Sequence, residues 1–282
     1  MKETLELRVN LDYAHMLFKS EEGKYLGTSI KIIELSKKDP RYNQIPLIAK
    51  QVQDKYNRSF FFGWKIKRKY SNEEYNSANL FHLKIKTTFE PAGEECGTLY
   101  DEIETCKICG VNRKQINRLH LKYSSIPKKD IARIISGEVI VSEKFVNSYK
   151  ERGLKGAKFE PVVLNGGRSK YYQLDTSTEI ELSKKTVAGI NPFNLSTSNE
   201  GEVYKCPYNH TIGLNILSEP CVLRNSLIND YDFFASKQRI GVKRGLLQTN
   251  PVYLCTSEFY KMVVEENLKG FEFEIAHIDD FE

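Results

Sequence analysis

Two short stretches of this chain place thiol and imidazole groups at spacings that suit a metal ion. Cys106-Lys-Ile-Cys109 puts two thiols three positions apart, which is half of a tetrahedral site. Cys206-Pro-Tyr-Asn-His210 offers a second pair of donors about one hundred residues later. A closed structural zinc site needs four N or S donors. The sequence therefore predicts one split zinc site, with these ligands: Cys106, Cys109, Cys206 and His210.

Other roles for the thiols stay open at this point. A redox pair of the thioredoxin type begins a helix, whereas Gly110 and Asn112 follow the first pair and favour a turn. Cys96 lies ten residues before the first pair and is an alternative fourth ligand. Cys221 and Cys255 are expected to be buried without a chemical role. A zinc hydrolase is disfavoured, because four protein ligands leave no position for water or substrate.

Composition sets broad limits on the class of protein. The chain has 282 residues, 40% of them hydrophobic, six cysteines and a formal charge of +5. This is enough apolar content for one large core or two modest ones. No window approaches the roughly 20 apolar residues of a membrane helix, and the first residues lack the apolar block of a signal peptide. We therefore expect a cytoplasmic protein with reduced or metal-bound thiols.

An internal repeat is the second strong signal. Residues 139–162 align with residues 253–276 at a constant offset of 114, and both read as strand, helix, strand. Ser142 and Thr256 are suitable N-cap residues at equivalent positions. Gly153 and Asn267 end the two helices, and both residue types tolerate the left-handed backbone of a helix C-terminus. Each copy follows one of the two metal-binding stretches, so each is predicted to supply half of the site.

The residues before the first metal-binding stretch contain no comparable copy. Alternating polar and apolar residues predict strands at 5–11, 29–35, 59–67 and 80–89, and a helix at 45–56. The predicted class is α+β, with an N-terminal β-rich lobe over residues 1–90 and a double zinc-knuckle domain over residues 91–282. A polar loop is expected at residues 195–201, before the second stretch.

These motifs resemble the double-CXXCG motif proteins described in myxobacteria, which are grouped with immunity proteins of bacterial toxin systems. The resemblance covers roughly residues 80–277. It is carried by Phe-Glu-Pro-Ala-Gly-Glu-Glu-Cys-Gly-Thr-Leu-Tyr-Asp before the first thiol pair, by Gly137-Glu-Val-Ile-Val-Ser142, and by the later Cys-Pro-x-x-His. The sequence departs from the family pattern at the second motif, where Asn209 replaces a cysteine and His210 replaces a glycine. His210 would restore the ligand count, whereas Asn209 would leave an open site.

The resemblance implies a non-catalytic protein that binds a cognate bacterial toxin and covers its active site. It says nothing of the toxin's chemistry or of the oligomeric state.

Nucleic-acid binding is the alternative function, because Phe60-Phe-Phe-Gly-Trp64 lies beside a run of basic residues up to Tyr70. The same stretch also reads as a half-buried strand, with Trp64, Ile66 and Arg68 on one face and the lysines between them on the other. The strand reading is favoured, so we do not expect a nucleic-acid partner.

Overall fold

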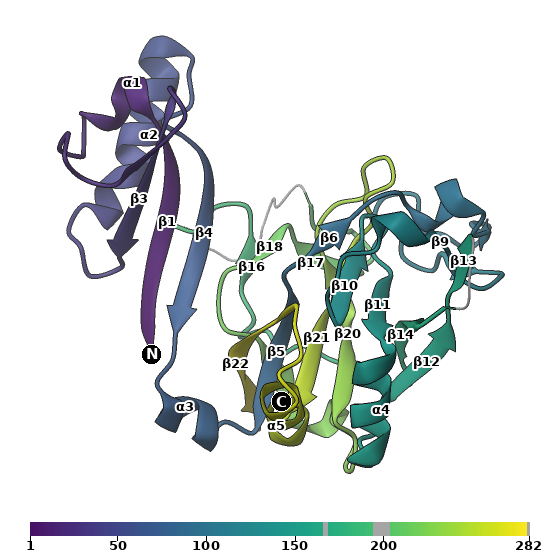
Figure 1. Cartoon of the computed structure of the whole chain (residues 1–282). Coiled ribbons are helices and arrows are strands. Elements are labelled where there is room, and N and C mark those ends of the chain that lie inside the picture. The colour runs from purple at the N-terminus through teal and green to yellow at the C-terminus, as the bar shows by residue number, and fades with distance from the viewer. Residues whose placement is uncertain (166–168, 194–203, 281–282) are drawn as a thin grey trace. The chain divides into compact units, whose positions relative to one another are not determined.

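The computed structural model describes residues 1–165, 169–193 and 204–280, and divides the chain into two compact units (Figure 1). The first unit is Met1–Ser77 with Asn191–Ser196, and the second is Ala78–Ile190 with Thr197–Glu282. Strands predominate over helices in the chain, which agrees with the predicted α+β class. The polar loop predicted at residues 195–201 lies outside the described residues. Within those residues no helix is long and apolar enough to cross a membrane.

The N-terminal unit is an antiparallel sheet of four strands in the order β2-β3-β1-β4. Alternate residues of its strands are buried, as in Leu5, Leu7 and Val9 of β1, and cross-strand pairing places Ile33 and Leu35 of β3 on the same face. The strand bounds are Lys24–Leu26, Ile30–Ser36, Lys2–Asn10 and Phe61–Lys69 in sheet order.

Short helical segments complete this unit. Helix α2 (Ile45–Tyr56) has a proline in its first turn, where a missing N–H costs no helical hydrogen bond. It buries Ile45 and Val52, and it ends at Asn57, whose φ of 51° is the left-handed conformation that asparagine tolerates. The other segments are α1 (Leu11–Ala14), η1 (Tyr42–Gln44) and α3 (Asn72–Ser77).

The division between the units falls earlier than the sequence suggested. We placed the boundary after residue 90, whereas the compact units divide after Ser77. Strand β5 (Leu80–Ile85) pairs with β21 (Asn250–Thr256) and β22 (Phe271–Asp279) of the second unit. The pairing partners lie 170 to 196 positions later in the chain, so the local pattern of the strand could not assign it to a unit.

The second unit contains two larger sheets. The first has the order β12-β14-β11-β10-β6, and the second has the order β15-β20-β21-β5-β22-β19 with β17 paired to β20. The strands of the first sheet are Ala157–Pro161, Tyr171–Thr176, Val139–Ser142, Ile131–Ile134 and Thr88–Phe89, in sheet order. The strands of the second sheet not yet given are Glu179–Ile180 (β15), Phe233–Ile240 (β20), Cys221–Leu223 (β19) and Thr211–Gly213 (β17).

The described residues of the second unit also form three two-stranded pairs and three 3-10 turns. The pairs are β9 (His120–Lys122) with β13 (Val163–Asn165), β7 (Tyr100–Asp101) with β8 (Lys114–Gln115), and β16 (Ala188–Gly189) with β18 (Asn215–Ile216). The turns are η2 (Gly93–Cys96), η3 (Tyr123–Ser125) and η4 (Arg224–Ser226).

The two larger sheets share one pattern of pairing. In the first, β14 lies between β11 and β12 and is antiparallel to both. In the second, β5 lies between β21 and β22 in the same way. Strand β6 follows β5 in sequence but pairs in parallel with β10 of the first sheet. Strand β15 follows β14 but pairs in parallel with β20 of the second sheet. The first sheet therefore takes its strand β14 from the part of the chain after β13, and the second sheet takes its strand β5 from the part before β13.

Helices α4 (Glu143–Glu151) and α5 (Ser257–Glu265) begin and end in equivalent ways. The hydroxyl of Ser142 accepts the N–H of Phe145, and that of Thr256 accepts the N–H of Phe259. After the helices, Gly153 and Asn267 have φ values of 66° and 51°. These are the caps that the sequence predicted, and they give the two strand–helix–strand segments the same turn geometry.

Two aspartates link these segments reciprocally. The carboxylate of Asp130 accepts the Ser142 hydroxyl and the backbone N–H of Lys269, both at 2.7 Å. The carboxylate of Asp232 accepts the Thr256 hydroxyl at 2.8 Å and the backbone N–H of Lys155 at 2.9 Å. Each aspartate therefore binds the N-cap residue of one helix and the backbone of the turn that follows the other helix.

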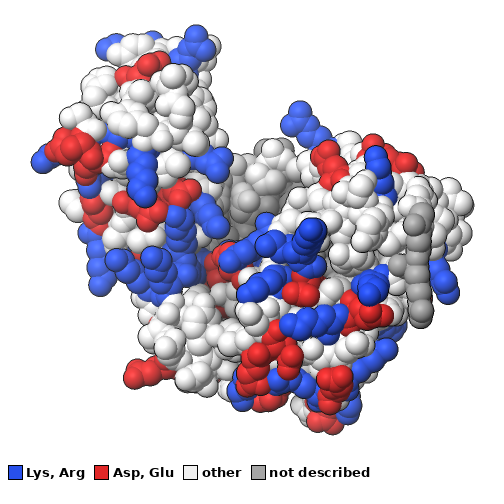
Figure 2. All heavy atoms as spheres, in the orientation of Figure 1, with Lys and Arg blue, Asp and Glu red and all other residues white. Residues whose placement is uncertain are grey.

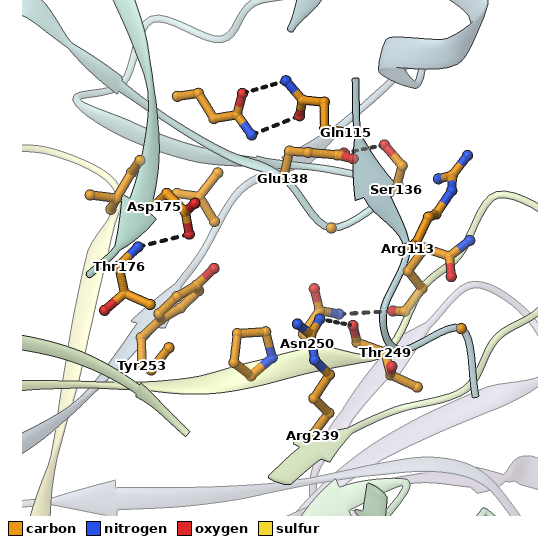
Figure 3. A pocket seen from close by; sticks show the side chains of 18 of the residues that line it. Arg113, Gln115, Ser136, Glu138, Asp175, Thr176, Arg239, Thr249, Asn250 and Tyr253 are labelled. Carbon is orange, nitrogen blue, oxygen red and sulfur yellow. Dashed lines mark hydrogen bonds between the residues drawn. The ribbon is translucent and has the colours of Figure 1, made fainter. Parts of the chain in front are cut away.

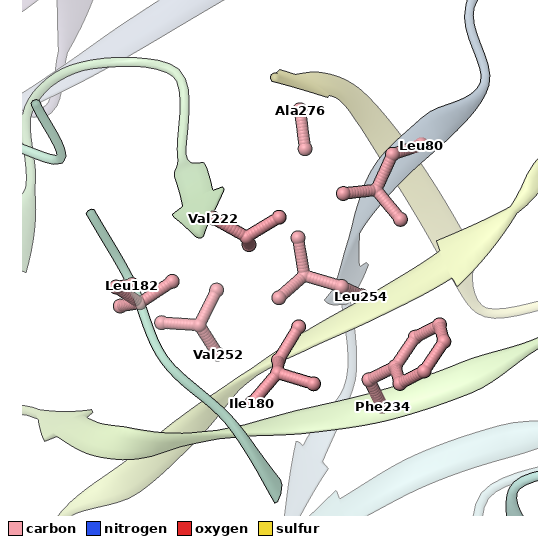
Figure 4. Close-up of a cluster of buried hydrophobic side chains, with 8 residues drawn as sticks. All are labelled: Leu80, Ile180, Leu182, Val222, Phe234, Val252, Leu254 and Ala276. Atoms are coloured by element: carbon pink, nitrogen blue, oxygen red, sulfur yellow. The ribbon is translucent and has the colours of Figure 1, made fainter. Parts of the chain in front are cut away.

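Apolar side chains from distant parts of the second unit meet in its core. One cluster joins the start of β5 to strands from the C-terminal half (Figure 4). Its buried members are Leu80, Ile180, Leu182, Val222, Phe234, Val252, Leu254 and Ala276. A second cluster, around Leu121, Ile134 and Ile140, belongs to the first half.

Candidate metal centre

The structure brings all four predicted ligands together. The ligand atoms of Cys106, Cys109, Cys206 and His210 all lie within 4.8 Å of one another. The sulfurs of Cys106 and Cys206 are 3.9 Å apart, and Nδ1 of His210 lies 3.5 Å from the Cys109 sulfur and 3.7 Å from the Cys206 sulfur. The two halves of the cluster come from turns that are one hundred residues apart in the chain.

The first pair of thiols is set by a tight turn, which we call the first Cys turn (residues 106–110). The N–H of Gly110 donates to the Cys106 carbonyl, and the N–H of Cys106 donates to the Val111 carbonyl, both at 2.8 Å. Gly110 has a φ of 78°, and a Cβ there would lie 2.3 Å from Oε1 of Gln248. The positive φ therefore favours glycine at this position, whereas the Gln248 side chain could move away from a Cβ. The turn does not open a helix, unlike a redox CxxC pair.

The second pair is set by the Cys–His turn (residues 206–210). Asn209 takes the left-handed conformation with a φ of 59°, and its N–H donates to the Cys206 carbonyl at 2.9 Å. The N–H of Cys206 donates to the Thr211 hydroxyl at 2.8 Å. Asn209 thus has a backbone role in the turn, and the imidazole of His210 supplies the fourth donor of the cluster.

Neighbouring strands of the second sheet hold both turns. The Arg239 N–H on β20 donates to the His210 carbonyl at 2.8 Å. The Thr249 hydroxyl, one residue before β21, donates to the Cys109 carbonyl at 2.9 Å. Because β20 and β21 pair with each other, one rigid element fixes the separation of the two turns.

The remaining cysteines lie apart from the cluster. The group of ligand atoms found among the described residues does not include Cys96, the alternative fourth ligand. Cys255 is fully buried on β21, and burial raises the pKa of its thiol well above the ordinary value. Cys221 is also buried, with a raised pKa from the same cause. Both are therefore unreactive neutral thiols.

The thiols of the first Cys turn differ in their electrostatic surroundings. Burial raises the pKa of Cys109 to about 12, because the charged form loses contact with water. Burial also disfavours the Cys106 thiolate, but backbone N–H groups of Cys109 and Ile108 and the side chain of His210 outweigh it and lower its pKa to about 6. Cys109 and Cys206 are 3% and 1% exposed, whereas Cys106 and His210 are half-buried. Only one side of the cluster therefore faces solvent.

The donor set and its spacing fit a tetrahedral ion. Metal–sulfur bonds of about 2.3 Å and metal–nitrogen bonds of about 2.0 Å at tetrahedral angles give separations of about 3.8 Å between sulfurs and about 3.5 Å between sulfur and nitrogen. Three separations in the structure, of 3.9, 3.5 and 3.7 Å, are close to these values, and all four ligand atoms lie within 4.8 Å of one another. Thiolate and imidazole donors are soft to borderline ligands, which exclude Mg²⁺ and Ca²⁺.

A polar cavity of about 300 Å³ adjoins the first Cys turn (Figure 3). Tyr253 and Arg239 line it from the second sheet, Asp175 lines it from β14 of the first, and Glu138 lines it from the residue before β11. Glu138 accepts hydrogen bonds from the hydroxyls of Tyr100 and Ser136. Nothing in the sequence pattern indicated this cavity, because its walls come from strands that pair only in the folded chain.

In the aromatic and basic stretch of the N-terminal unit, some rings are buried in the sheet, whereas Phe62 is 57% exposed. Phe60 is 1% exposed, and Trp64 and Ile66 pair with Leu7 and Leu5 on the buried face of the sheet. The lysines between them are on the other face, as the strand interpretation predicted. Phe60 and Trp64 are therefore not placed to stack on bases, and nucleic-acid binding through the exposed Phe62 stays an untested alternative.

Comparison with known proteins adds no relative: no family model matches the chain, and no curated protein matches it.

Proposed function

We propose that Cys106, Cys109, Cys206 and His210 bind one structural zinc ion that clamps the first Cys turn to the Cys–His turn. The observation that carries this proposal is the convergence of these four donors, whose ligand atoms all lie within 4.8 Å of one another. Four protein ligands fill the coordination sphere of zinc, which makes the ion structural and leaves no position for a substrate. Binding free energy at such a site adds directly to the free energy of folding.

We further propose that the second unit arose by duplication and that each copy supplies half of the metal site. The sequence repeat covered only residues 139–162 and 253–276. The equivalent caps, the reciprocal aspartate bonds and the matching insertion of β14 and β5 support a longer repeat, from β5 to β13 and from β14 to β22. A single ion between the copies accounts for the two ligands in each.

The biological role that we propose is binding of a cognate bacterial toxin as a cytoplasmic immunity protein. This rests on the resemblance of residues 80–277 to the double-CXXCG motif proteins, and a closed zinc site is compatible with a non-catalytic role. Such a complex would bury a standard interface of about 1,600 Å², with a few anchoring side chains.

Two experiments test these proposals separately. Elemental analysis of the purified chain should give one zinc per molecule, and the variant Cys206→Ser should lose it. Co-expression of the chain with a toxin encoded beside it should restore growth of a sensitive host. Zinc binding without rescue by any neighbouring gene product would retain the metal site and overturn the immunity role.

A further inference from the structure

The N-terminal unit accounts for all of the chain's net formal charge. Residues 1–77 contain 15 Lys or Arg and 10 Asp or Glu, which gives +5, the value for the whole chain. Residues 191–196, which belong to the same unit, add no charge. The second unit therefore has 27 residues of each sign and no net charge. An asymmetry of this kind concentrates any attraction for anions in one unit.

Most of this charge lies on one face of the four-stranded sheet. The strand register separates the buried residues, such as Leu5 and Leu7, from an outward face on the opposite side. Six cations and two carboxylates have outward positions, a formal charge of +4. They are Lys2, Arg8, Lys24, Lys65, Lys67 and Lys69, with Glu6 and Glu34. We call this surface the basic sheet face. Figure 2 shows Lys and Arg gathered over this part of the chain, with Asp and Glu among them.

The charges of this face are only partly balanced. Lys67 lies 2.5 Å from carboxylate oxygens of both Glu6 and Glu34. The other five cations are exposed and have no ion pair among the described residues. Lys2 stands directly opposite Lys69 in the register. Like charges at opposed positions destabilise a sheet, so this pairing weakens the isolated unit.

Protection of a sheet edge does not account for the pattern. Lysines on an edge strand such as β4 discourage pairing with another chain. However, Lys2 and Arg8 lie on β1, which is paired on both sides. Charge on this interior strand does not serve the edge, so it favours a binding role for the face.

The composition of the face favours a protein as the partner. Leu26, Ile30 and Ile32 occupy outward positions beside Arg8 and give it an aliphatic part. Among the described residues, no aromatic residue stands at a paired outward position of the four strands, and the exposed Phe62 lies at the bulge of β4, so the paired face offers no row of rings on which successive bases could stack. The central carboxylates Glu6 and Glu34 would repel phosphates, whereas mixed charges fix the register of a protein complex.

We propose that the basic sheet face binds an acidic surface on a protein partner. Carboxylates of that partner would reduce the repulsion between opposed cations such as Lys2 and Lys69. Apolar side chains of the partner would cover the aliphatic part of the face. The proposal depends only on the N-terminal unit, so it holds or fails independently of the zinc site and of the immunity role.

The test uses the full chain and fluorescence anisotropy with labelled poly-L-glutamate at low salt. The variant Lys65→Gln/Lys69→Gln removes two charges from the face. Its matched control, Lys38→Gln/Lys50→Gln, removes two exposed charges elsewhere in the same unit. We expect the face variant to weaken binding about fivefold, from two exposed charge pairs, and the control to change it much less. Because Lys69 opposes Lys2, the melting temperature of the face variant should not fall.

Two outcomes would overturn the proposal. Equal losses in the two variants would mean that only the total charge matters. Tighter binding to a DNA duplex than to poly-L-glutamate, sensitive to the same face variant, would assign the surface to nucleic acid.

Discussion

Replacing Asp130 with alanine should destabilise the second unit, because this carboxylate joins both of its halves. The change removes acceptors for the Ser142 hydroxyl and for the N–H of Lys269. A hydrogen bond to a charged group contributes about 1.5 to 3 kcal/mol. Asp130 is half-buried, so the lower end applies, and two bonds give a loss of about 3 kcal/mol. The variant Asp232→Ala should lose a similar amount, since its carboxylate makes the equivalent bonds.

Chemical denaturation followed by circular dichroism measures this loss. For a unit of this size, about 3 kcal/mol corresponds to a fall in melting temperature of roughly 6 to 12 °C. Asp175→Ala is the matched control, because Asp175 is exposed and its carboxylate accepts, within the part of the chain that the structure describes, just the N–H of the next residue. It should change the free energy of unfolding by less than about 0.5 kcal/mol. A loss below about 1 kcal/mol for Asp130→Ala, or clearly unequal losses for the two variants, would refute the reciprocal role of these residues.

Three further predictions concern single positions. Cys206→Ser should release the metal and unfold the second unit at ordinary temperature, because structural zinc contributes about 10 kcal/mol or more; an unchanged melting curve would contradict a structural ion. Gly156→Ala should lower the free energy of unfolding by about 3 kcal/mol, because φ is 101° and a Cβ would lie 2.3 Å from the Phe233 carbonyl oxygen. Its control, Gly153→Asn, should fold normally because Asn267 takes the same backbone conformation. The hydrogen bond that the His277 imidazolium donates to the Glu219 carboxylate raises the pKa of His277 above 6.5. This pair therefore stabilises the fold below pH 6.5, and its contribution is lost as pH rises through the raised pKa. His277→Gln should therefore reduce stability more at about pH 5.5 than at about pH 8.5, and an equal effect at both would exclude protonation as the cause.

Local patterns in the sequence predicted the features that depend on neighbouring residues. Helix α2 has the predicted bounds, and the caps at Ser142, Thr256, Gly153 and Asn267 have the expected geometry. Each depends on hydrogen bonds within a few residues, so residue type and spacing contain enough information. The candidate ligands were predicted from the short spacing within each pair, Cys106 with Cys109 and Cys206 with His210. The two pairs were joined because a closed zinc site needs four donors.

Features that depend on distant pairing were not predicted. Strand β14 went unrecognised, since only Leu174 is buried in it and the alternation is weak. Strand β5 was assigned to the N-terminal lobe, although it pairs with β21 and β22. The walls of the polar cavity were missed for the same reason. Nothing in a short window of sequence records which remote strand will lie beside it.

The exchange of β5 and β14 between the two larger sheets restricts how this chain can mature during synthesis. When residues up to Asn165 have left the ribosome, the gap between β11 and β12 is still empty, because β14 has yet to be made. Strand β5 must likewise wait for β22, close to the last residue described, before it has both neighbours. The first sheet therefore cannot form in full before Thr176 has been made, and the second cannot do so before β22, so partly synthesised chains expose unpaired strand edges that are prone to aggregation.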